Sequence, residues 1–490
     1  MIRRYLMKRW ILVIESYEGI QKNAVNMLSG YLSGLLSYTL PVRYAQTLSA
    51  QELAEYNVIA VGCCEKHPIF RAYEKQQLLT LPKEEEGYAI YVGETQEGEK
   101  QTIAIAGVDE KGVLYGCMQF IGEYCGNKLY KKGDLWKTDF FDFPLERTLP
   151  KWSVSTYPVV KTRAIWKWGY VMYDYKSFFD NMARLRLNEI VIWNDYVPFN
   201  AKDVVAYAHA LGIKVIWGFA WGWTTNCAQI MEELCTKNGL QRLKENVLNT
   251  YQQQYADTNS DGIYFQSFTE MNVDNVNGQC VAEIVTELVN DIAGALLTEY
   301  PTLHIQFGLH ATSVKTHLDV LKKVDKRVHI IWEDCGAFPY HYSPDAIDDF
   351  AETYAFTEKL LSLRGKEEKF GAVLKGMLKL DWGAFEHHKG SFILGERDKS
   401  FITERQIKKN KIWKLIRGDW LKNAELLRKT IALTSQNCDN PIVQALVEDS
   451  MFENKITLPV AIYAQILWSP TIAMDDILEI VSKNPFVENE

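Results

Sequence analysis

Beyond residue 160 the chain repeats one pattern, a short apolar run followed by a longer segment with helical periodicity. The runs are nearly continuous, which is typical of parallel strands buried on both faces. Seven or eight such units in tandem favour a closed (β/α)8 barrel, because a doubly wound sheet would need a Gly-rich turn after its first strand. We expect the strands at Arg163–Trp168, Glu189–Trp193, Lys214–Phe219, Gly262–Ser267, His304–Gly308, His329–Trp332, within Phe370–Leu380, and, more weakly, Ser391–Leu394.

A smaller α/β unit precedes the barrel. Its expected strands are Trp10–Glu15, Asn57–Gly62, Tyr88–Val92 and Thr102–Ala106, and its expected helices are Ile20–Leu36 and Gly112–Cys125. The segment 139–159 is interpreted as a linker because it contains Pro144, Pro150 and Pro158. From Glu404 to Lys483 the pattern is helical. The predicted division is therefore 1–150 for a non-catalytic α/β domain, 151–400 for the barrel and 401–490 for a C-terminal helical region.

Composition narrows the class of partner. With 54 Lys+Arg against 62 Asp+Glu, the net charge of −8 argues against nucleic acid. The apolar run Trp10–Ile14 is too short for a signal-peptide core, and no stretch approaches the roughly 20 apolar residues of a membrane span. Nine cysteines without framework spacing are typical of reduced thiols. We expect a cytoplasmic protein without a membrane partner, and homo-oligomerisation stays open.

Barrel enzymes carry their working residues at the carboxyl ends of the strands. Here carboxylates and tryptophans gather at those ends, and flat indole faces are suited to stacking on sugar rings. Plain core packing is the alternative for each tryptophan. No His/Asp/Glu set has convincing metal spacing, so we expect neither metal nor cofactor. The candidate substrate-binding residues are Trp166, Lys167, Trp168, Trp193, Asn194, Trp221, Trp223, Asn272, His310, Trp332, Glu333 and Trp382.

Lys167 has two interpretations. Its ammonium either pairs with a substrate carboxylate or with a neighbouring barrel carboxylate such as Glu270.

Glycosidic cleavage needs two carboxyl groups that flank one bond. Glu270 follows the fourth apolar strand directly, and partly apolar surroundings suit a carboxyl group that must hold its proton. It is the expected general acid, although it could simply begin the next helix.

The position of the second group, two or more strands away around the rim, favours inversion. The candidates for this base are Asp334 or Glu333 after strand six, and Asp381 or Glu386 after strand seven.

Several segments resemble known glycosidases. The first unit, which ends in GVLYGCMQFIGEYC, resembles the non-catalytic domain before the barrel in family 20 hexosaminidases and family 67 α-glucuronidases. The segments RAIWKWG, FFDNMARLRLNEIVIWN, HALGIKVIWGFAWGW and GIYFQSFTEMN resemble the barrel of the same group. The resemblance implies a glycoside hydrolase with the acid after strand four.

The branch within this group affects the mechanism. Family 20 enzymes carry an adjacent Asp-Glu pair after strand four, whereas Thr269 precedes Glu270 here. Family 84 enzymes use paired aspartates at this place. Family 67 enzymes have a lone glutamic acid there and base carboxylates after later strands, which is similar to Glu270 with Asp334 and Glu386 or Asp381. The longer family 67 signatures around the uronate are not recognisable.

The leading hypothesis is an exo-acting glycoside hydrolase on oligosaccharides that carry a uronic acid or an N-acetylhexosamine. A catalytically silent carbohydrate-binding barrel is the alternative from another class. A barrel lyase or isomerase would normally need a metal or phosphate site, which the sequence does not offer.

Overall fold

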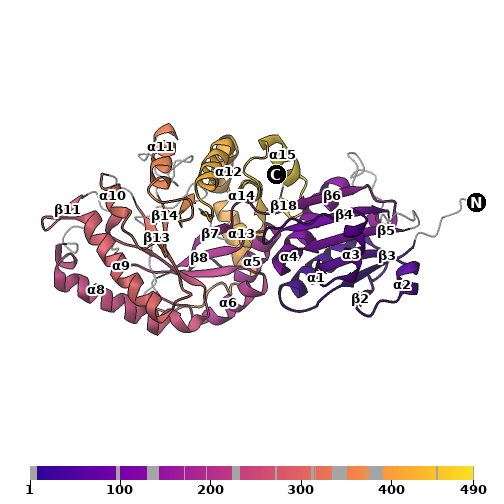
Figure 1. Ribbon diagram of the computed structural model, residues 1–490, viewed down its shortest axis with the longest axis horizontal. Helices are drawn as coiled ribbons and strands as arrows, with labels where there is room; N and C mark the ends of the chain where they lie inside the picture. Colours follow the sequence, from indigo (N-terminus) through magenta and orange to yellow (C-terminus); the bar gives the residue numbers. More distant parts are fainter. Residues whose placement is uncertain are drawn as a thin grey trace, which may run out of the picture.

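In the computed structural model of the chain, the described residues are 8–94, 100–129, 143–169, 172–194, 196–222, 232–270, 273–310, 314, 316–333, 350–368, 370–374, 390–447 and 451–488. Within these ranges the chain forms a six-stranded sheet with its helices, then a closed barrel (Figure 1). No helix in them is both long and apolar enough to cross a bilayer.

The first sheet has the order β2-β1-β3-β5-β4-β6. Strands β1, β2, β3 and β5 run parallel, and β4 runs antiparallel to β5 and β6. The elements expected up to residue 125 are confirmed, whereas β2, α2 and α3 were not predicted. The elements are β1 (Trp10–Ile14), α1 (Gly19–Leu32), β2 (Val42–Tyr44), α2 (Ala50–Glu55), β3 (Asn57–Cys63), α3 (Pro68–Lys75), β4 (Tyr88–Glu94), β5 (Gln101–Gly107), α4 (Glu110–Gln119), the π-helical segment Phe120–Lys128 and β6 (Trp152–Thr156).

Both faces of this sheet are covered. Alternate residues of a strand point to opposite faces. Leu12 and Ile14 accordingly pack in the core shared with α1, α4 and the barrel, whereas Ile11 and Val13 pack with Phe70 of α3. Helices α1 and α4 therefore lie on the side that faces the barrel (Figure 1).

The edge strand β6 corrects the expected linker. It pairs with β4, with Ser153 opposite Tyr91. Trp152 and Val154 are half-buried and alternate with exposed serines, which is the period-two pattern of a strand. Pro150 and Pro158 flank the strand rather than interrupt it, a placement that an edge strand tolerates. The first sheet thus extends beyond the expected boundary at residue 150.

Eight parallel strands close into a barrel in the order β10-β13-β14-β15-β16-β7-β8-β9, which confirms the predicted (β/α)8 fold. The strands are β7 (Thr162–Trp168), β8 (Glu189–Trp193), β9 (Lys214–Gly218), β10 (Gly262–Gln266), β13 (His304–Leu309), β14 (Val328–Trp332), β15 (Phe370–Leu374) and β16 (Ile442–Leu446). The helices include α5 (Tyr175–Arg184), α6 (Ala201–Ala210), α8 (Lys237–Thr250), α9 (Val281–Glu299), α10 (Leu318–Leu321), α11 (Phe350–Leu361) and α12 (Lys399–Asn437). A two-stranded hairpin, β11 (Asn275–Val276) with β12 (Gln279–Cys280), precedes α9.

The expected eighth strand was wrong. Ser391–Leu394 forms no barrel strand, and β16 closes the barrel by pairing with both β15 and β7. The run IVQAL has an apolar alternation broken by Gln444, and it lies between long helical segments that obscured it. The barrel therefore extends to Leu446, beyond the expected boundary at residue 400.

The helix after β16 belongs to the barrel wall. Helix α14 (Leu458–Trp468) is apolar on all sides and almost wholly buried, as expected of a helix without a solvent face. The Tyr463 hydroxyl donates to the carbonyl oxygens of Ala164 in β7 and Val443 in β16, at 2.8 and 3.1 Å. The remaining C-terminal elements are α13 (Met451–Asn454), β17 (Ile456–Thr457), α15 (Met474–Ser482) and β18 (Val487–Glu488).

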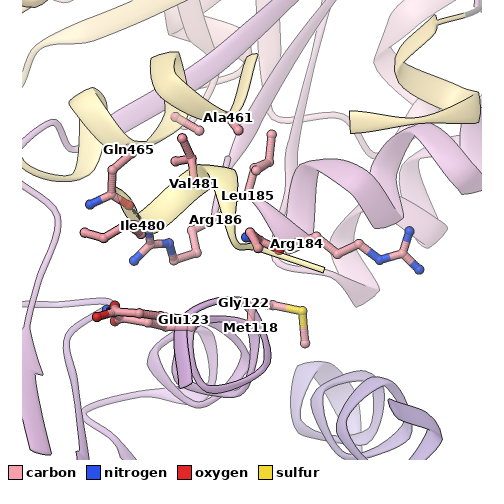
Figure 2. Close-up of a pocket in the computed structure, with 13 residues that line it drawn as sticks. Met118, Gly122, Glu123, Arg184, Leu185, Arg186, Ala461, Gln465, Ile480 and Val481 are labelled. Atoms are coloured by element: carbon pink, nitrogen blue, oxygen red, sulfur yellow. Dashed lines mark hydrogen bonds between the residues drawn. The ribbon is translucent and has the colours of Figure 1, made fainter. Parts of the chain in front are cut away.

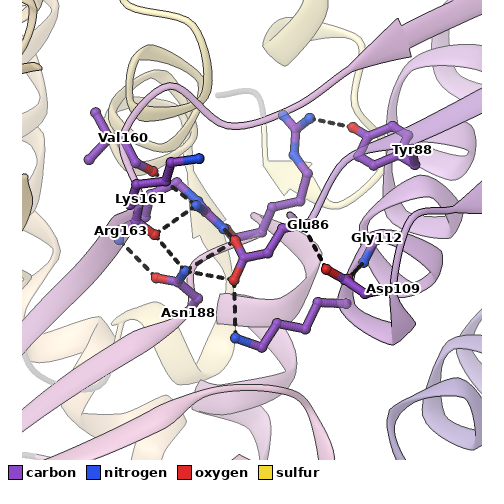
Figure 3. Close-up of polar contacts among 10 residues, drawn as sticks. Glu86, Tyr88, Asp109, Gly112, Val160, Lys161, Arg163 and Asn188 are labelled. Atoms are coloured by element: carbon purple, nitrogen blue, oxygen red, sulfur yellow. Dashed lines mark hydrogen bonds and ion pairs between the residues drawn. The ribbon is translucent and has the colours of Figure 1, made fainter. Parts of the chain in front are cut away.

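A buried ion pair joins the first unit to the barrel (Figure 3). Arg163 of β7 is fully buried and donates to Glu86 at 2.7 Å. Lys111 and Asn188 also donate to Glu86, at 3.0 and 3.2 Å. Burial raises the pKa of Glu86, but the charges of Arg163 and Lys111 outweigh it and lower the pKa to about 2. This carboxylate is therefore ionised throughout the physiological pH range.

A second contact lies where α4 and the π-helical segment meet α14 and α15 (Figure 2). Arg186 donates to the Tyr88 hydroxyl and to Gln465, and its guanidinium lies 4.3 Å from the ring of Trp468. The crevice beside it, which Met118 and Val481 also line, measures 30 Å3. That is about the volume of one water molecule, so we treat this region as a packing interface.

Candidate functional site

The carboxyl ends of the barrel strands form the candidate site. The Glu270 segment follows β10, and residue 333 follows β14, two strands further around the closed barrel. Between them lies β13, which ends beside His310. Inward-facing side chains of these three strands meet near the mouth of the barrel.

Glu333 is the centre of a buried polar cluster. Its Oε1 accepts from the Tyr264 hydroxyl at 2.7 Å, and the Gln266 amide reaches both carboxylate oxygens at 2.7 Å. His310 Nε2 lies 3.0 Å from Oε2. All four side chains are at most 7% exposed. A carboxylate has only acceptor sites when it is ionised, and three protein donors are aimed at this one.

Gly308 makes this cluster possible. A Cβ at this position of β13 would lie 2.1 Å from Glu333 Oε1 and 2.5 Å from the Tyr264 hydroxyl. With no side chain on the intervening strand, Tyr264 of β10 can reach Glu333 after β14. Burial, and then the neighbouring carboxylate, raise the pKa of Tyr264 well above 10, so the phenol keeps the proton that it donates.

The same region fixes the backbone that carries Glu270. A short 3-10 helix, η8 (Phe268–Glu270), follows β10. The His310 amide donates to the Thr269 hydroxyl at 3.1 Å, so Thr269 ties η8 to the end of β13. Phe268 is buried against Gly222, where a Cβ would lie 2.6 Å from the ring. Gly222 also has a φ of +88°, which glycine adopts readily.

Asn194 offers a donor at the carboxyl end of β8. Its side-chain oxygen accepts from the Tyr196 amide at 3.1 Å, which fixes the orientation of the side chain. Its Nδ2 is buried and has no hydrogen-bond partner among the described residues. A buried donor without an acceptor is costly, and a hydroxyl-rich ligand would satisfy it.

The candidate tryptophans whose side chains are described lie in the core, in agreement with the alternative of plain core packing. Trp166 and Trp193 stack on each other inside the barrel, with ring centroids 6.1 Å apart. Trp221 stacks on Phe265, and Trp332 packs against Phe356 of α11, both outside the strand ring. Side chains of alternate strand residues point into the barrel or into the helical layer. The sequence analysis placed each tryptophan along its strand but did not predict to which of these two sides its side chain points.

Lys167 lies on the helical side of β7. Its ammonium donates to the Val447 carbonyl at 3.0 Å and lies 5.9 Å from the ring of Phe178 in α5. Neighbouring Trp166 points into the barrel, so alternation directs Lys167 away from it. The side chain of Glu270 lies outside the described residues, so both interpretations of Lys167 stay predictions.

Several predicted site residues lie outside the described part of the chain. The backbone of Glu270 and Trp168 is described, but their side chains are not. The others outside it are Asp334, Asp381, Glu386, Trp223, Asn272 and Trp382.

Two members of the cluster, Tyr264 and Gln266, were missed by the sequence reasoning. They stand two residues apart in the apolar strand GIYFQSF, and this spacing directs both to one face. Polar residues at alternate positions of a barrel strand are the signal that could have found them. Among the described residues no group of three metal-binding side chains gathers.

Comparison with known proteins identifies the first unit. Residues 8–120 match the model of the glycosyl hydrolase family 67 N-terminus. This finding confirms the resemblance of the N-terminal unit to the domain that precedes a glycosidase barrel. No curated protein matches the chain by sequence.

Solved structures share the fold at low identity. One is a family 138 enzyme that targets pectin rhamnogalacturonan II, with a TM-score of 0.51 and 11% identity over 97% of this chain. The chain spans 52% of the length of that enzyme. Another is a family 20 β-N-acetylglucosaminidase, with a TM-score of 0.50 and 10% identity. The matched region covers 100% of this chain and 97% of that enzyme. At this identity both show that the fold of the chain is shared.

Proposed function

We propose that this protein is a glycoside hydrolase that cleaves an oligosaccharide at the carboxyl-end mouth of its barrel. The family 67 match over residues 8–120 and the closed barrel behind it support this class. The observation that carries the proposal is the buried cluster that links the ends of β10, β13 and β14 through Glu333. Of these three strands, β10 and β14 are each followed within a few residues by a further carboxylate, Glu270 after β10 and Asp334 after β14.

In this proposal Glu270 is the general acid. It protonates the leaving oxygen while a second carboxylate activates water on the opposite face of the sugar. Asp334 is the first choice for this base, with Glu386 and Asp381 as the alternatives. The separation by two or more strands favours inversion, for which the two carboxyl groups stand about 6.5–9.5 Å apart.

The Glu333 cluster has a positioning role in the proposal. Its anchored His310 holds Thr269 and thereby the η8 backbone that carries Glu270. A fixed acid is needed because small displacements of a reacting group cost large factors in rate. The Asn194 Nδ2 is suited to donate a hydrogen bond to a sugar hydroxyl oxygen, which would be its missing partner.

The proposed substrate is an oligosaccharide from whose end a uronic acid or an N-acetylhexosamine is removed. The family 67 match favours the uronic acid, and the fold shared with a β-N-acetylglucosaminidase favours the amino sugar.

The test is a panel of nitrophenyl glycosides that includes α- and β-uronides, N-acetylhexosaminides and neutral hexosides. Release of nitrophenol from one sugar class, above the rate of a preparation made in parallel from cells that lack the protein, would support the proposal. Sugar binding by calorimetry without turnover of any nitrophenyl or natural oligosaccharide would instead indicate a silent carbohydrate-binding barrel.

A further inference from the structure

The amino-terminal end of the barrel carries an unusual polar layer. In most (β/α)8 barrels the interior is filled mainly by branched aliphatic side chains. Here Gln444 of β16 donates to Gln306 of β13 at 2.7 Å, and Gln306 donates to Glu189 of β8 at 2.8 Å. All three side chains are at most 4% exposed. Glu189 therefore ends a buried chain of amides at the end of the barrel opposite the proposed active site.

Basic side chains surround this layer on the side of the first unit. Lys214 is paired in register with Glu189, so both point to the same face. His304 and His329 come from β13 and β14, with ring centroids 6.2 Å apart. Lys161, just before β7 and labelled in Figure 3, lines the same cavity.

These residues line a pocket of 350 Å3 between the barrel and the first unit. Pockets for small molecules typically measure about 300–1,000 Å3, so this one has room for a single small metabolite. Lys161 and Lys214 are only half-buried, which leaves their ammonium groups within reach of a ligand.

The charges of this pocket are unevenly compensated. Glu86, on its wall, is already paired with Arg163 and Lys111. In the described part of the chain, neither Lys161 nor Lys214 has an ion pair or a hydrogen bond from its ammonium group. Lys214 is in register with Glu189, whose Oε1 accepts from Gln306, and its charge acts on the carboxylates of Glu189 and Asp261. Lys161 and Lys214 thus face one polar cavity, which Glu85 and Glu189 also line.

We infer that this pocket binds a small oxyanion that also carries hydroxyl groups, such as a sugar acid or a sugar phosphate. The ammonium groups of Lys161 and Lys214 hold the carboxylate or phosphate, because charge-assisted hydrogen bonds to oxyanions are the strong ones. His304 and His329 lie beside them as further polar partners. The Glu189 and Gln306 layer accepts from and donates to the hydroxyls. Since Lys161 precedes the barrel and Lys111 belongs to the first unit, the bound anion spans the junction between the two.

The experiment is isothermal titration calorimetry of the full chain at pH 7 and low ionic strength. The probes are glucuronate, glucose 6-phosphate, inorganic phosphate and neutral glucose. We expect at least one anion to bind and glucose not to bind. Lys161→Met and Lys214→Met should each weaken that anion about tenfold, since each removes one charge-assisted contact. The exposed Lys202 of α6 provides the control, and Lys202→Met should leave the affinity unchanged.

The titrations also distinguish a sugar acid from a phosphate ester, and binding at the junction pocket from binding at the active-site mouth. Glucuronate alone would indicate a sugar acid, whereas glucose 6-phosphate with inorganic phosphate would indicate a phosphate ester. Because the active-site mouth could also hold a uronate, the Lys161→Met/Lys214→Met double variant is titrated in parallel: an anion at the mouth would still bind to it, whereas an anion in the junction pocket would not. Absence of anion binding to the unchanged protein would overturn the inference. So would equal binding by the Lys161→Met/Lys214→Met double variant with an unchanged melting temperature, and the polar layer would then be purely structural.

Discussion

At the scale of single residues, Glu333 joins side chains from β10 and the end of β13 at the mouth of the barrel. Among the described residues, Tyr264, Gln266 and His310 lie within hydrogen-bond distance of its carboxylate, and a Cβ on Gly308 would lie 2.1 Å from its Oε1. Its direct use as a base would require it to leave these donors. The arrangement therefore favours Glu333 as a positioning residue and leaves the base to Asp334, Glu386 or Asp381.

Tyr264→Phe tests this positioning role. The change removes one donor to a buried carboxylate and keeps the ring, so we expect the free energy of unfolding to fall by about 1–3 kcal/mol. If the cluster holds η8 in place, kcat should fall more than KM changes. Urea unfolding and steady-state kinetics measure the two effects. Tyr463→Phe, which removes a buried hydroxyl far from the cluster, is the control: it should lower stability without the selective loss of kcat. Equal kinetics in both variants would contradict the role.

Glu189→Gln tests the buried layer at the other end. Burial raises the pKa of Glu189 to about 7, partly offset by Gln306 and Lys214. The folded state then binds the proton more tightly than the unfolded state, so stability declines as pH rises from about 4.5 to about 7. The shift corresponds to about 3 kcal/mol.

We therefore expect Glu189→Gln to unfold with a higher free energy than the unchanged protein at pH 8 and with a similar one at pH 4.5. Urea titrations at the two pH values measure this difference. Glu358→Gln, at an exposed position of α11, should show no such pH dependence. A lower stability of Glu189→Gln at pH 8 would mean that the carboxylate is needed in its ionised form.

At the scale of elements, η8 is the segment that places Glu270. Gly222→Ala should displace it, because the new Cβ collides with Phe268 and the φ of +88° is strained for alanine. We expect a loss of about 1–3 kcal/mol in unfolding free energy and a lower kcat. Gly278→Ala is the matched control, since Gly278 has a φ of +76° with no atom near its Cβ. The unfolding free energy should therefore fall further in Gly222→Ala than in Gly278→Ala, by the energy of the collision with Phe268. Identical effects of the two changes on stability and kcat would contradict the role of η8 in placing Glu270.

The elements also show what the sequence could predict. The first seven barrel strands were found because each is an apolar run followed by a helical segment. Strand β16 was missed because Gln444, one of its inward residues, is polar and binds Gln306 rather than packing as an aliphatic side chain. Tyr264 and Gln266 were missed for the related reason that their partner, Glu333, is 67 residues or more away in sequence. Contacts between distant strands cannot be seen in the local pattern.

At the scale of the whole molecule, the junction of the first unit with the barrel rests on Glu86 and Arg163. The pKa of Glu86 is lowered to about 2, so the pair contributes stability above about pH 4.5 that is lost as the pH falls toward 2. Glu86→Gln leaves Arg163 buried without its counter-charge, and removal of one partner of a buried pair costs about 3–5 kcal/mol.

We expect Glu86→Gln to lower the unfolding free energy by that amount at pH 7, and by less at pH 3. Glu85→Gln, at the exposed neighbouring position, is the control and should change little. Urea unfolding at both pH values is the measurement. A pH-independent loss would show that the hydrogen bonds, and not the charge, hold the junction.

The two ends of the barrel have different roles in this account. The carboxyl-end mouth, with Glu270 on η8, is the proposed catalytic end. The amino-terminal end, with Lys161 and Lys214, is the proposed anion site, and the first unit covers it. The first unit, whose residues 8–120 match the model of the family 67 N-terminus, would then be part of a ligand site as well as a support for the barrel.

The central claim is that Glu270 donates the proton to the leaving oxygen, and the ratio of two hydrolysis rates of Glu270→Gln tests it most directly. For a natural oligosaccharide, whose leaving group needs the proton, kcat/KM should fall by about 10²–10⁴-fold. For the nitrophenyl glycoside of the same sugar, which needs little protonation, it should fall far less. Equal losses on both substrates would contradict the assignment of Glu270 as the acid, and full activity on the natural oligosaccharide would place the catalytic carboxylate elsewhere.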